Sequence, residues 1–155
     1  MFVGTLEAIF YAEQSDHEMS NVDSIDVQAG KGIVQDRYST GEGTFYKPIP
    51  DRQITLIEAE AVEAVGREYD FELTPEETRR NLVTRNVPLN HLVGREFFVG
   101  NVRIKGIRLC EPCAHLEKLT GKKVMSALMH RGGLRAQVLS DGAVRVGQEI
   151  RIAEA

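Results

Sequence analysis

The sequence lacks tryptophan, a run of about 18 consecutive apolar residues that would cross a membrane, and an excess of positive charge. Its first 18 residues also lack the basic start and cleavable apolar core of a signal peptide. With 19 Lys and Arg against 23 Asp and Glu, it lacks the excess of basic residues that is typical of a general nucleic-acid-binding protein. We therefore expect a cytoplasmic protein that binds neither nucleic acid nor membrane.

Cysteine is equally scarce: Cys110 and Cys113 are the only two, and they share one short segment. They cannot join distant parts of the chain, so we expect free thiols in a reducing compartment. The 155 residues contain no repeat, no low-complexity run and no linker rich in proline or serine. These features predict one domain over residues 1–155.

Short alternating segments dominate the secondary-structure pattern. Strands are predicted over 3–11, 23–29, 53–57, 82–84, 96–99, 102–109 and 134–138, in a segment that begins at Ile33 and ends at Asp36 and Arg37, and in two final strands around 144–146 and 150–152. Helices are predicted over 58–69, 114–119 and 123–130, with a short one after the capping sequence 74–77 and a surface excursion over 39–51. The pattern favours a mainly β fold with α insertions, as a β-barrel or a strongly bent sheet.

The strand over 102–109 contains a change of phase. Val102 and Ile104 share one parity, Ile107 and Leu109 the other, and Gly106 stands between them. A glycine at a parity break predicts a β-bulge, which changes the direction of the residues that follow. Here those residues are the two cysteines.

Four interpretations of Cys110-Glu111-Pro112-Cys113 follow from the residues alone. A zinc site would need two further ligands, such as His115 and one of His17, His91 or His130, and no second C-x-x-C is present. A thioredoxin-like dithiol would be expected earlier, inside a βαβ unit. The third is a single reactive thiolate at Cys113, before a helix whose partial positive charge favours the anion. The fourth is that both cysteines are small buried hydrophobic residues.

A basic constellation accompanies the thiols. Arg79, Arg80 and Asn81 lie between a short helix and a strand, Asp36 and Arg37 end another predicted strand, and Arg52 precedes a third. Arginine presents a planar fork of donors that suits phosphate, and asparagine adds a donor and an acceptor. Each arginine alone could simply be solvated or paired. Their position at the ends of elements predicts that they converge.

With these residues identified, the chain resembles the MOSC domain, named for the C-terminal part of molybdenum cofactor sulfurase. The order and spacing of several short pieces carry the resemblance over about residues 4–152. The pieces are Gly30-Lys31-Gly32-Ile33, Asp36-Arg37-Tyr38, Arg52 to Glu58, Arg79 to Thr84, Leu92-Val93-Gly94, Phe98-Val99-Gly100, Cys110 to Cys113, and Arg131-Gly132-Gly133-Leu134.

The resemblance implies a barrel-like β fold and a site that handles sulfur or the molybdenum cofactor. The family's key cysteine, thought to carry a persulfide or to ligate molybdenum, matches Cys113. The Arg-x-Asn pattern that contacts the pterin phosphate in related proteins matches Arg79 and Asn81, and an Asp-Arg pair after a glycine turn matches Asp36 and Arg37. One departure is Gln35, which stands where many relatives have glycine.

The leading hypothesis from the sequence is a stand-alone MOSC protein that binds molybdenum cofactor and reduces N-hydroxylated compounds with electrons from a partner protein. A second hypothesis is a sulfur carrier, in which Cys113 receives a persulfide from a sulfur donor such as a cysteine desulfurase and passes it to a metal-sulfur centre. A third is a non-catalytic binding module with both thiols buried. His115 is either close to the chemistry or a structural hydrogen-bonding group.

Overall fold

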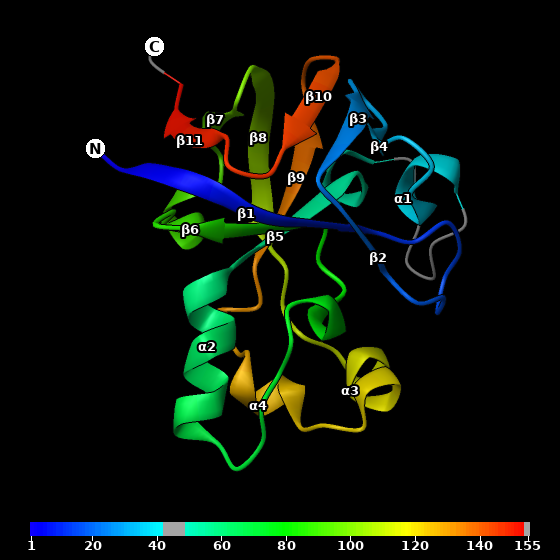
Figure 1. Cartoon of the computed structure of the whole chain (residues 1–155), viewed down its shortest axis with the longest axis vertical. Helices are drawn as coiled ribbons and strands as arrows, with labels where there is room; N and C mark the ends of the chain where they lie inside the picture. The colour runs from blue at the N-terminus through cyan, green and yellow to red at the C-terminus, as the bar shows by residue number, and fades with distance from the viewer. Residues whose placement is uncertain (42–48, 154–155) are drawn as a thin grey trace.

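A computed structural model describes residues 1–41 and 49–153 (Figure 1). Its main sheet has the strand order β11-β7-β8-β9-β5-β6-β1-β2, and β11 also pairs with β1, so that seven strands close into a barrel. Within that sheet only the β5–β6 pair is parallel among the described strands. The strands are β1 (Val3–Tyr11), β2 (Ser20–Val22), β5 (Ile54–Glu58), β6 (Leu82–Arg85), β7 (Glu96–Val99), β8 (Val102–Leu109), β9 (Leu134–Val138) and β11 (Glu149–Ile152).

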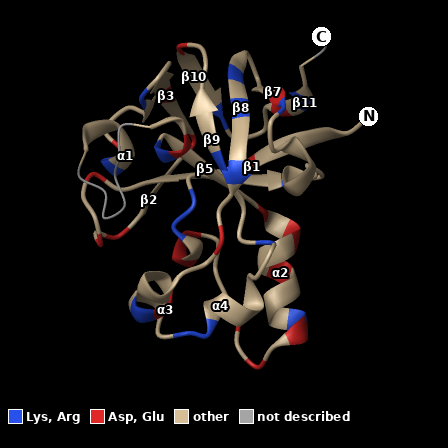
Figure 2. Ribbon diagram, turned by 180° about the vertical axis from the view of Figure 1, so that it is seen from behind, with Lys and Arg blue, Asp and Glu red and all other residues tan. Residues whose placement is uncertain are grey.

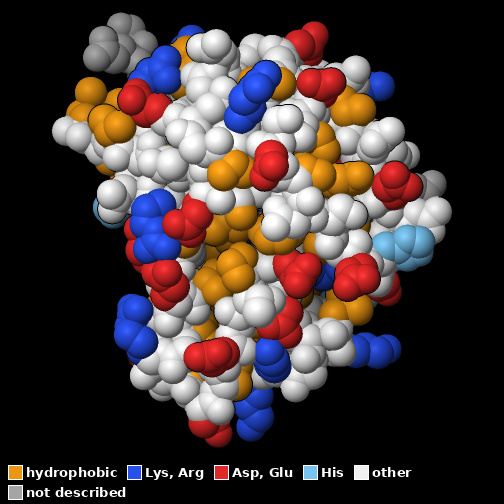
Figure 3. Space-filling model, viewed as in Figure 1, with side chains coloured by type: hydrophobic (Ala, Val, Ile, Leu, Met, Phe, Trp, Pro, Cys, Tyr) orange, Lys and Arg blue, Asp and Glu red, His pale blue; other side chains and the backbone are white. Residues whose placement is uncertain are grey.

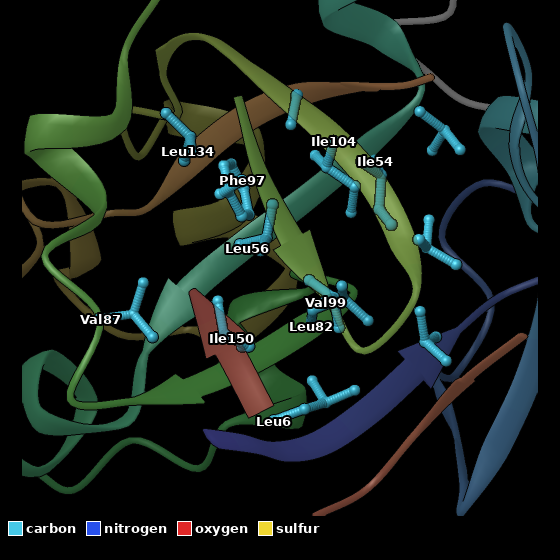
Figure 4. Close-up of a cluster of buried hydrophobic side chains, with 14 of the residues drawn as sticks. Leu6, Ile54, Leu56, Leu82, Val87, Phe97, Val99, Ile104, Leu134 and Ile150 are labelled. Atoms are coloured by element: carbon cyan, nitrogen blue, oxygen red, sulfur yellow. The ribbon is translucent and has the colours of Figure 1, made fainter. Parts of the chain in front are cut away.

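The inward side chains of these strands fill the barrel (Figure 4). Leu6, Leu56, Phe97 and Ile104 have no exposed surface. Alternation along each strand produces this core, because successive side chains point to opposite faces of a sheet. The barrel is therefore a packed interior, and a ligand has to bind on its outside or at its ends.

A second sheet and several short helices surround the barrel. The second sheet has the order β10-β3-β4. Its strands are β3 (Ser24–Gln28), β4 (Gly32–Ile33) and β10 (Gly142–Arg145); the helices are α1 (Arg37–Thr40), α2 (Ala59–Glu68), α3 (Ala114–Thr120) and α4 (Val124–Ala127), with 3₁₀ turns η1 (Pro50–Arg52), η2 (Glu76–Thr78) and η3 (Leu89–Leu92).

Helices α2, α3 and α4 form a lobe below the barrel in the view of Figure 1. A second apolar cluster joins the two parts, with Phe10, Ile57 and Val83 from outward positions of the strands. Leu116 of α3 and Leu128, just after α4, pack against them. This cluster fixes the direction in which the chain leaves β8 and enters α3.

The predicted fold class is confirmed, and most strands match their predicted bounds. Residues 3–11, 96–99, 102–109 and 134–138 form strands as expected, and the β8–β9 register shifts between Gly106 and Arg108, which confirms the bulge. The two final strands also exist, but β10 pairs with β3 while β11 pairs with β7 and β1. Of the predicted excursion over 39–51, residues 42–48 lie outside the described residues.

The prediction that Asp36 and Arg37 end a strand is wrong. After β4 the chain turns at Gln35, which has φ +70°, and Asp36 becomes the N-cap of α1. Its carboxylate accepts the backbone N–H of Tyr38, as Asp commonly does at a helix start. Gln35 thus adopts the left-handed conformation that glycine would adopt more easily.

Two smaller differences concern elements that carry little sequence signal. The three-residue strand β2 was not predicted, and α4 ends at Ala127 rather than near His130. Among the described residues, no helix has both the length and the apolar character needed to cross a bilayer.

Candidate functional site

A cavity of about 230 Å³ opens between the outer wall of the barrel, α1, α3 and the loop after β1. Six of its lining residues are arginines, which makes it strongly cationic. Its lining residues are Ser15, Asp16, Arg37, Tyr38, Arg52, Arg79, Arg80, Arg108, Glu111, Cys113, His115, Leu116, Leu119 and Arg135. Figure 2 shows Lys and Arg on the segments that run from the barrel towards α3 and α4.

The rest of the surface is more evenly charged. On the face drawn in Figure 3, basic and acidic side chains are interspersed around a central group of hydrophobic ones. The formal charge of −4 is therefore compatible with a concentrated positive site. Such a site attracts a small anion into the cavity.

Cys113 lies at the boundary between the pocket and the second apolar cluster. It occupies the N-cap position of α3, is half-buried, and lines the cavity. Cys110, by contrast, has 1% of its surface exposed and does not line the cavity. The interpretation in which both thiols are buried therefore fits Cys110 alone.

The loop that carries the cysteines is packed closely against the chain before β9. A Cβ atom at Gly132 would lie 2.5 Å from the Cys110 carbonyl oxygen and 3.0 Å from Pro112 Cδ. Only glycine allows this approach without movement of the loop. The close contact between Gly132 and the cysteine loop therefore helps to fix the loop, and a larger side chain at this position would disrupt it.

Arg80 also fixes the cysteine loop, through hydrogen bonds to backbone carbonyls. Its buried guanidinium donates to the carbonyl oxygens of Gly132 (Nε, 2.8 Å), Thr78 (Nη1, 3.1 Å) and Cys110 (Nη2, 3.0 Å). Although Arg80 borders the cavity, each of its three guanidinium nitrogens already donates to a backbone carbonyl. Its function in the site is therefore to position the loop.

Arg37 and Arg79 lie together on another side of the cavity. Arg37 Nη2 donates to the Arg79 carbonyl oxygen at 3.1 Å, and Arg37 Nη1 lies 3.1 Å from Asp36 Oδ1. Arg79 adopts φ +60°, and its Nη1 donates to the His17 carbonyl oxygen at 2.6 Å. Burial and the neighbouring Arg37 lower the pKa of Arg79. Its Nη2 is buried without a hydrogen-bond partner among the described residues.

Asp36 and Asn81 are fully buried behind these arginines and do not line the cavity. Besides Tyr38 and Arg37, Asp36 accepts the Ala12 N–H. Asn81 Oδ1 accepts from Thr55 N and Oγ1, and its Nδ2 donates to Phe10 O and Asp36 Oδ1. Both side chains form hydrogen bonds inside the protein, so the geometry favours a role in supporting the neighbouring arginines over direct contact with a ligand.

Arg108 and Arg135 complete the cationic lining and were not singled out from the sequence. Arg135 points outward from β9 because its neighbours Leu134 and Ala136 point into the barrel core. Burial opposes the charge of Arg135, but attraction to Cys110, Tyr38 and Asp51 outweighs it and raises its pKa. The alternation of apolar residues on β9 indicates that Arg135 points away from the core. Nothing in the sequence indicates that a cavity lies next to it.

Two histidine–carboxylate pairs flank the cysteine loop. His115 Nε2 lies 2.7 Å from Asp16 Oδ1, and this hydrogen bond lowers the pKa of Asp16. On the other side, Glu111 Oε2 lies 2.8 Å from His130 Nδ1, and Glu111 Oε1 accepts the His130 N–H. Within residues 1–41 and 49–153, no group of three or more His, Cys, Asp or Glu side chains is arranged to hold a metal ion.

The 3₁₀ turn η2, which precedes Arg79 and Arg80, is stabilised by contacts of Glu77. Thr74 N–H donates to Glu77 Oε1 at 3.0 Å, and Lys122 Nζ lies 2.9 Å from the same carboxylate. Burial raises the pKa of Glu77, but these partners outweigh it and hold the pKa below its ordinary value of 4.5.

We expect Glu77→Ala to lower the free energy of unfolding by about 1 kcal/mol at neutral pH, as loss of a helix cap does. Because the folded-state pKa is depressed, the contribution exists above the unfolded-state pKa and disappears as pH falls through the folded value. Urea unfolding at about pH 7 and about pH 3 measures the free energy of unfolding in both conditions, and Glu76→Ala, at an exposed position, is the control. An equal destabilisation at both pH values would contradict this account.

Comparison with known proteins gives the family. The MOSC domain matches residues 26–151, whereas no curated protein matches the sequence. The YuaD protein from Bacillus subtilis has a similar structure, with a TM-score of 0.78, 18% identity, and coverage of 99% of this chain and 100% of that one.

Two YiiM structures are similar as well. The protein from Geobacillus stearothermophilus gives a TM-score of 0.75 at 14% identity, covering 97% of this chain and 75% of that one. The protein from Escherichia coli gives 0.69 at 16%, covering 100% and 71%. At these identities the likeness establishes the fold alone. The family match, which spans most of the chain, establishes more: this protein belongs to the MOSC domain family.

Proposed function

We propose that this protein binds molybdenum cofactor in the arginine-lined cavity, with Cys113 as the molybdenum ligand and Arg37 and Arg79 next to the pterin phosphate. One observation carries the proposal: the half-buried thiol of Cys113 lines the same cavity as six arginines. Soft thiolate sulfur suits a transition metal, and guanidinium forks suit phosphate. A pocket that offers both suits a cofactor that contains both.

The residues present fit such a group. Arg79 Nη2 is a buried donor without a partner among the described residues, and a buried donor of this kind normally finds one. Asp36 and Asn81 support the arginines from behind, through the contacts with Arg37 and with each other. The chain therefore supplies a preorganised anion site and a nearby thiol.

The bound cofactor would supply two-electron chemistry, here the reduction of an N-hydroxylated compound to the amine and water. That reaction consumes two electrons and two protons, and the electrons come from a partner protein. The His115–Asp16 pair at the cavity holds an exchangeable proton within the site. Leu116 and Leu119 contribute apolar surface to the lining of the cavity.

The proposal is tested by expressing the protein in cells that make molybdenum cofactor and measuring metal and pterin per chain. We expect close to one of each, and reduction of an N-hydroxylated probe when a reduced viologen dye replaces the partner protein. The same chain from cells unable to make the cofactor is the control. Folded protein that carries neither metal nor pterin after expression in competent cells would contradict the proposal.

A second candidate function uses the same thiol. The arginines around the partly accessible Cys113 would also stabilise a persulfide anion on its sulfur. In this function Cys113 carries sulfur that it receives from a donor such as a cysteine desulfurase. A persulfide-selective label on metal-free wild-type protein, lost in Cys113→Ala, would favour this sulfur-carrier function. A non-catalytic module with buried thiols instead predicts no prompt alkylation of Cys113.

A further inference from the structure

Arg80 is bound to backbone carbonyls, and the other five arginines of the cavity fall into two groups. Arg37 and Arg79 form the first, and Arg52, Arg108 and Arg135 form the second. Tyr38 lies between them, with its ring centre 4.8 Å from the Arg37 guanidinium carbon and with its hydroxyl interacting with Arg135. The pterin phosphate proposed above accounts for the first group only.

The second group places like charges directly opposite one another. Arg108 of β8 and Arg135 of β9 are cross-strand partners at the bulge, and Arg52 at the end of η1 faces the same cavity. Like charges at directly opposed positions destabilise a sheet pair. The fold therefore maintains an unfavourable arrangement at the edge of the cavity, which a bound anion would relieve.

One carboxylate offsets this charge incompletely. Asp51 Oδ2 contacts Arg108 Nε, and its Oδ1 lies 3.6 Å from Arg52 Nε. Burial raises the pKa of Asp51, yet the three arginines outweigh burial and lower it. Arg135 Nη1 nevertheless remains buried without a hydrogen-bond partner among the described residues, and Arg52 Nε and Asp51 Oδ1 face each other beyond hydrogen-bond distance, so neither is satisfied. Three guanidiniums and one carboxylate leave two positive charges and unused donors.

We propose that Arg52, Arg108 and Arg135 form a second oxyanion subsite that binds a phosphate group of the substrate. This inference rests on the proposed function, in which Arg37 and Arg79 hold the phosphate of the cofactor. A phosphate is a dianion with three acceptor oxygens near neutral pH, so it matches both the excess charge and the forked donors. The substrate class is then a phosphorylated N-hydroxylated compound.

Equilibrium dialysis against inorganic phosphate at low ionic strength tests the subsite, with the full chain from cells that make no cofactor. We expect two bound phosphates per chain. Arg108→Gln should weaken one site about tenfold or more, because it removes a charged donor from a half-exposed position. Arg79→Gln should weaken the other site, and Arg145→Gln, on β10, should change neither.

The outcomes separate this inference from the proposed function. A single phosphate lost only in Arg79→Gln would overturn the second subsite and leave the cofactor assignment intact. A single phosphate lost only in Arg108→Gln would support the subsite and contradict the cofactor assignment. Arg135→Lys, which keeps the charge but loses the fork, should also weaken the second site; unchanged phosphate binding in both variants would overturn the inference.

The loaded protein distinguishes the source of the second anion. We expect one phosphate site to remain after cofactor binding, and a lower KM for a phosphorylated N-hydroxylated compound than for its dephosphorylated form. Arg108→Gln should remove that KM difference. Release of a nucleotide in equal amount with the pterin would assign the subsite to an extended form of the cofactor and would overturn the substrate assignment.

Discussion

Replacing Cys113 with alanine is expected to remove molybdenum from the purified protein while the pterin is partly retained. Removing even a partner of a ligand can weaken metal binding by about 10–100-fold, and loss of the thiolate itself should exceed this. Arg37 and Arg79, which are proposed to bind the pterin phosphate, are unchanged in this variant, so a bound pterin should keep part of its binding energy. Metal and pterin content per chain, measured on wild type and variant together, gives the result directly.

Cys110→Ala is the matched control. Cys110 is buried outside the cavity, so its replacement should lower stability slightly and leave metal content unchanged. Under dithiol or zinc chemistry the two variants would instead be equally damaging. Full metal content in Cys113→Ala, together with a folded protein, would contradict the assignment of Cys113 as the ligand.

The barrel could be predicted because several of its strands, β8 and β9 above all, alternate between buried and more exposed residues. Residues 102–105 and 134–138 place every second side chain in the core, and the glycine at the parity break marked the bulge correctly. Strand pairing could not be predicted in the same way. The final strands β10 and β11 are neighbours in sequence but belong to different sheets, which depends on contacts with β3, β7 and β1.

The site was predictable in its residue types rather than in its arrangement. Arg37, Arg52, Arg79 and Arg80 do line one cavity, as the predicted convergence of the arginines requires, and Cys113 lines it as well. Asp36 and Asn81 turn inward because their hydrogen bonds link segments 24 to 71 residues apart, such as Asn81 Nδ2 to Phe10 O. No local pattern in the sequence records such pairings.

Arg80 illustrates the same limit. In the sequence it is one of two adjacent arginines that both suit an anion, and only the fold separates them. Arg79 adopts a left-handed conformation and leaves one buried nitrogen without a partner among the described residues, whereas Arg80 uses its guanidinium on three carbonyls. We therefore expect the two residues to differ sharply when each is replaced.

Arg80→Ala is expected to lower the free energy of unfolding by about 3–5 kcal/mol, because three buried carbonyl oxygens lose a charged donor. Arg79→Ala should cost only about 1 kcal/mol, since one hydrogen bond is lost and the burial of a charge is relieved. Urea unfolding of both variants measures the difference. Equal costs would contradict the assignment of Arg80 as the residue that holds the loop.

A readout on Cys113 separates positioning from stability. Arg80 bonds the Cys110 and Gly132 carbonyls, so its loss should loosen the loop and change the alkylation rate of Cys113 under conditions in which the variant remains folded. Arg80→Lys retains the charge but cannot reach three carbonyls, and should restore part of the stability without restoring the alkylation rate. If Arg80→Lys restored both, charge alone would be sufficient and the three-carbonyl geometry would not be what positions the thiol.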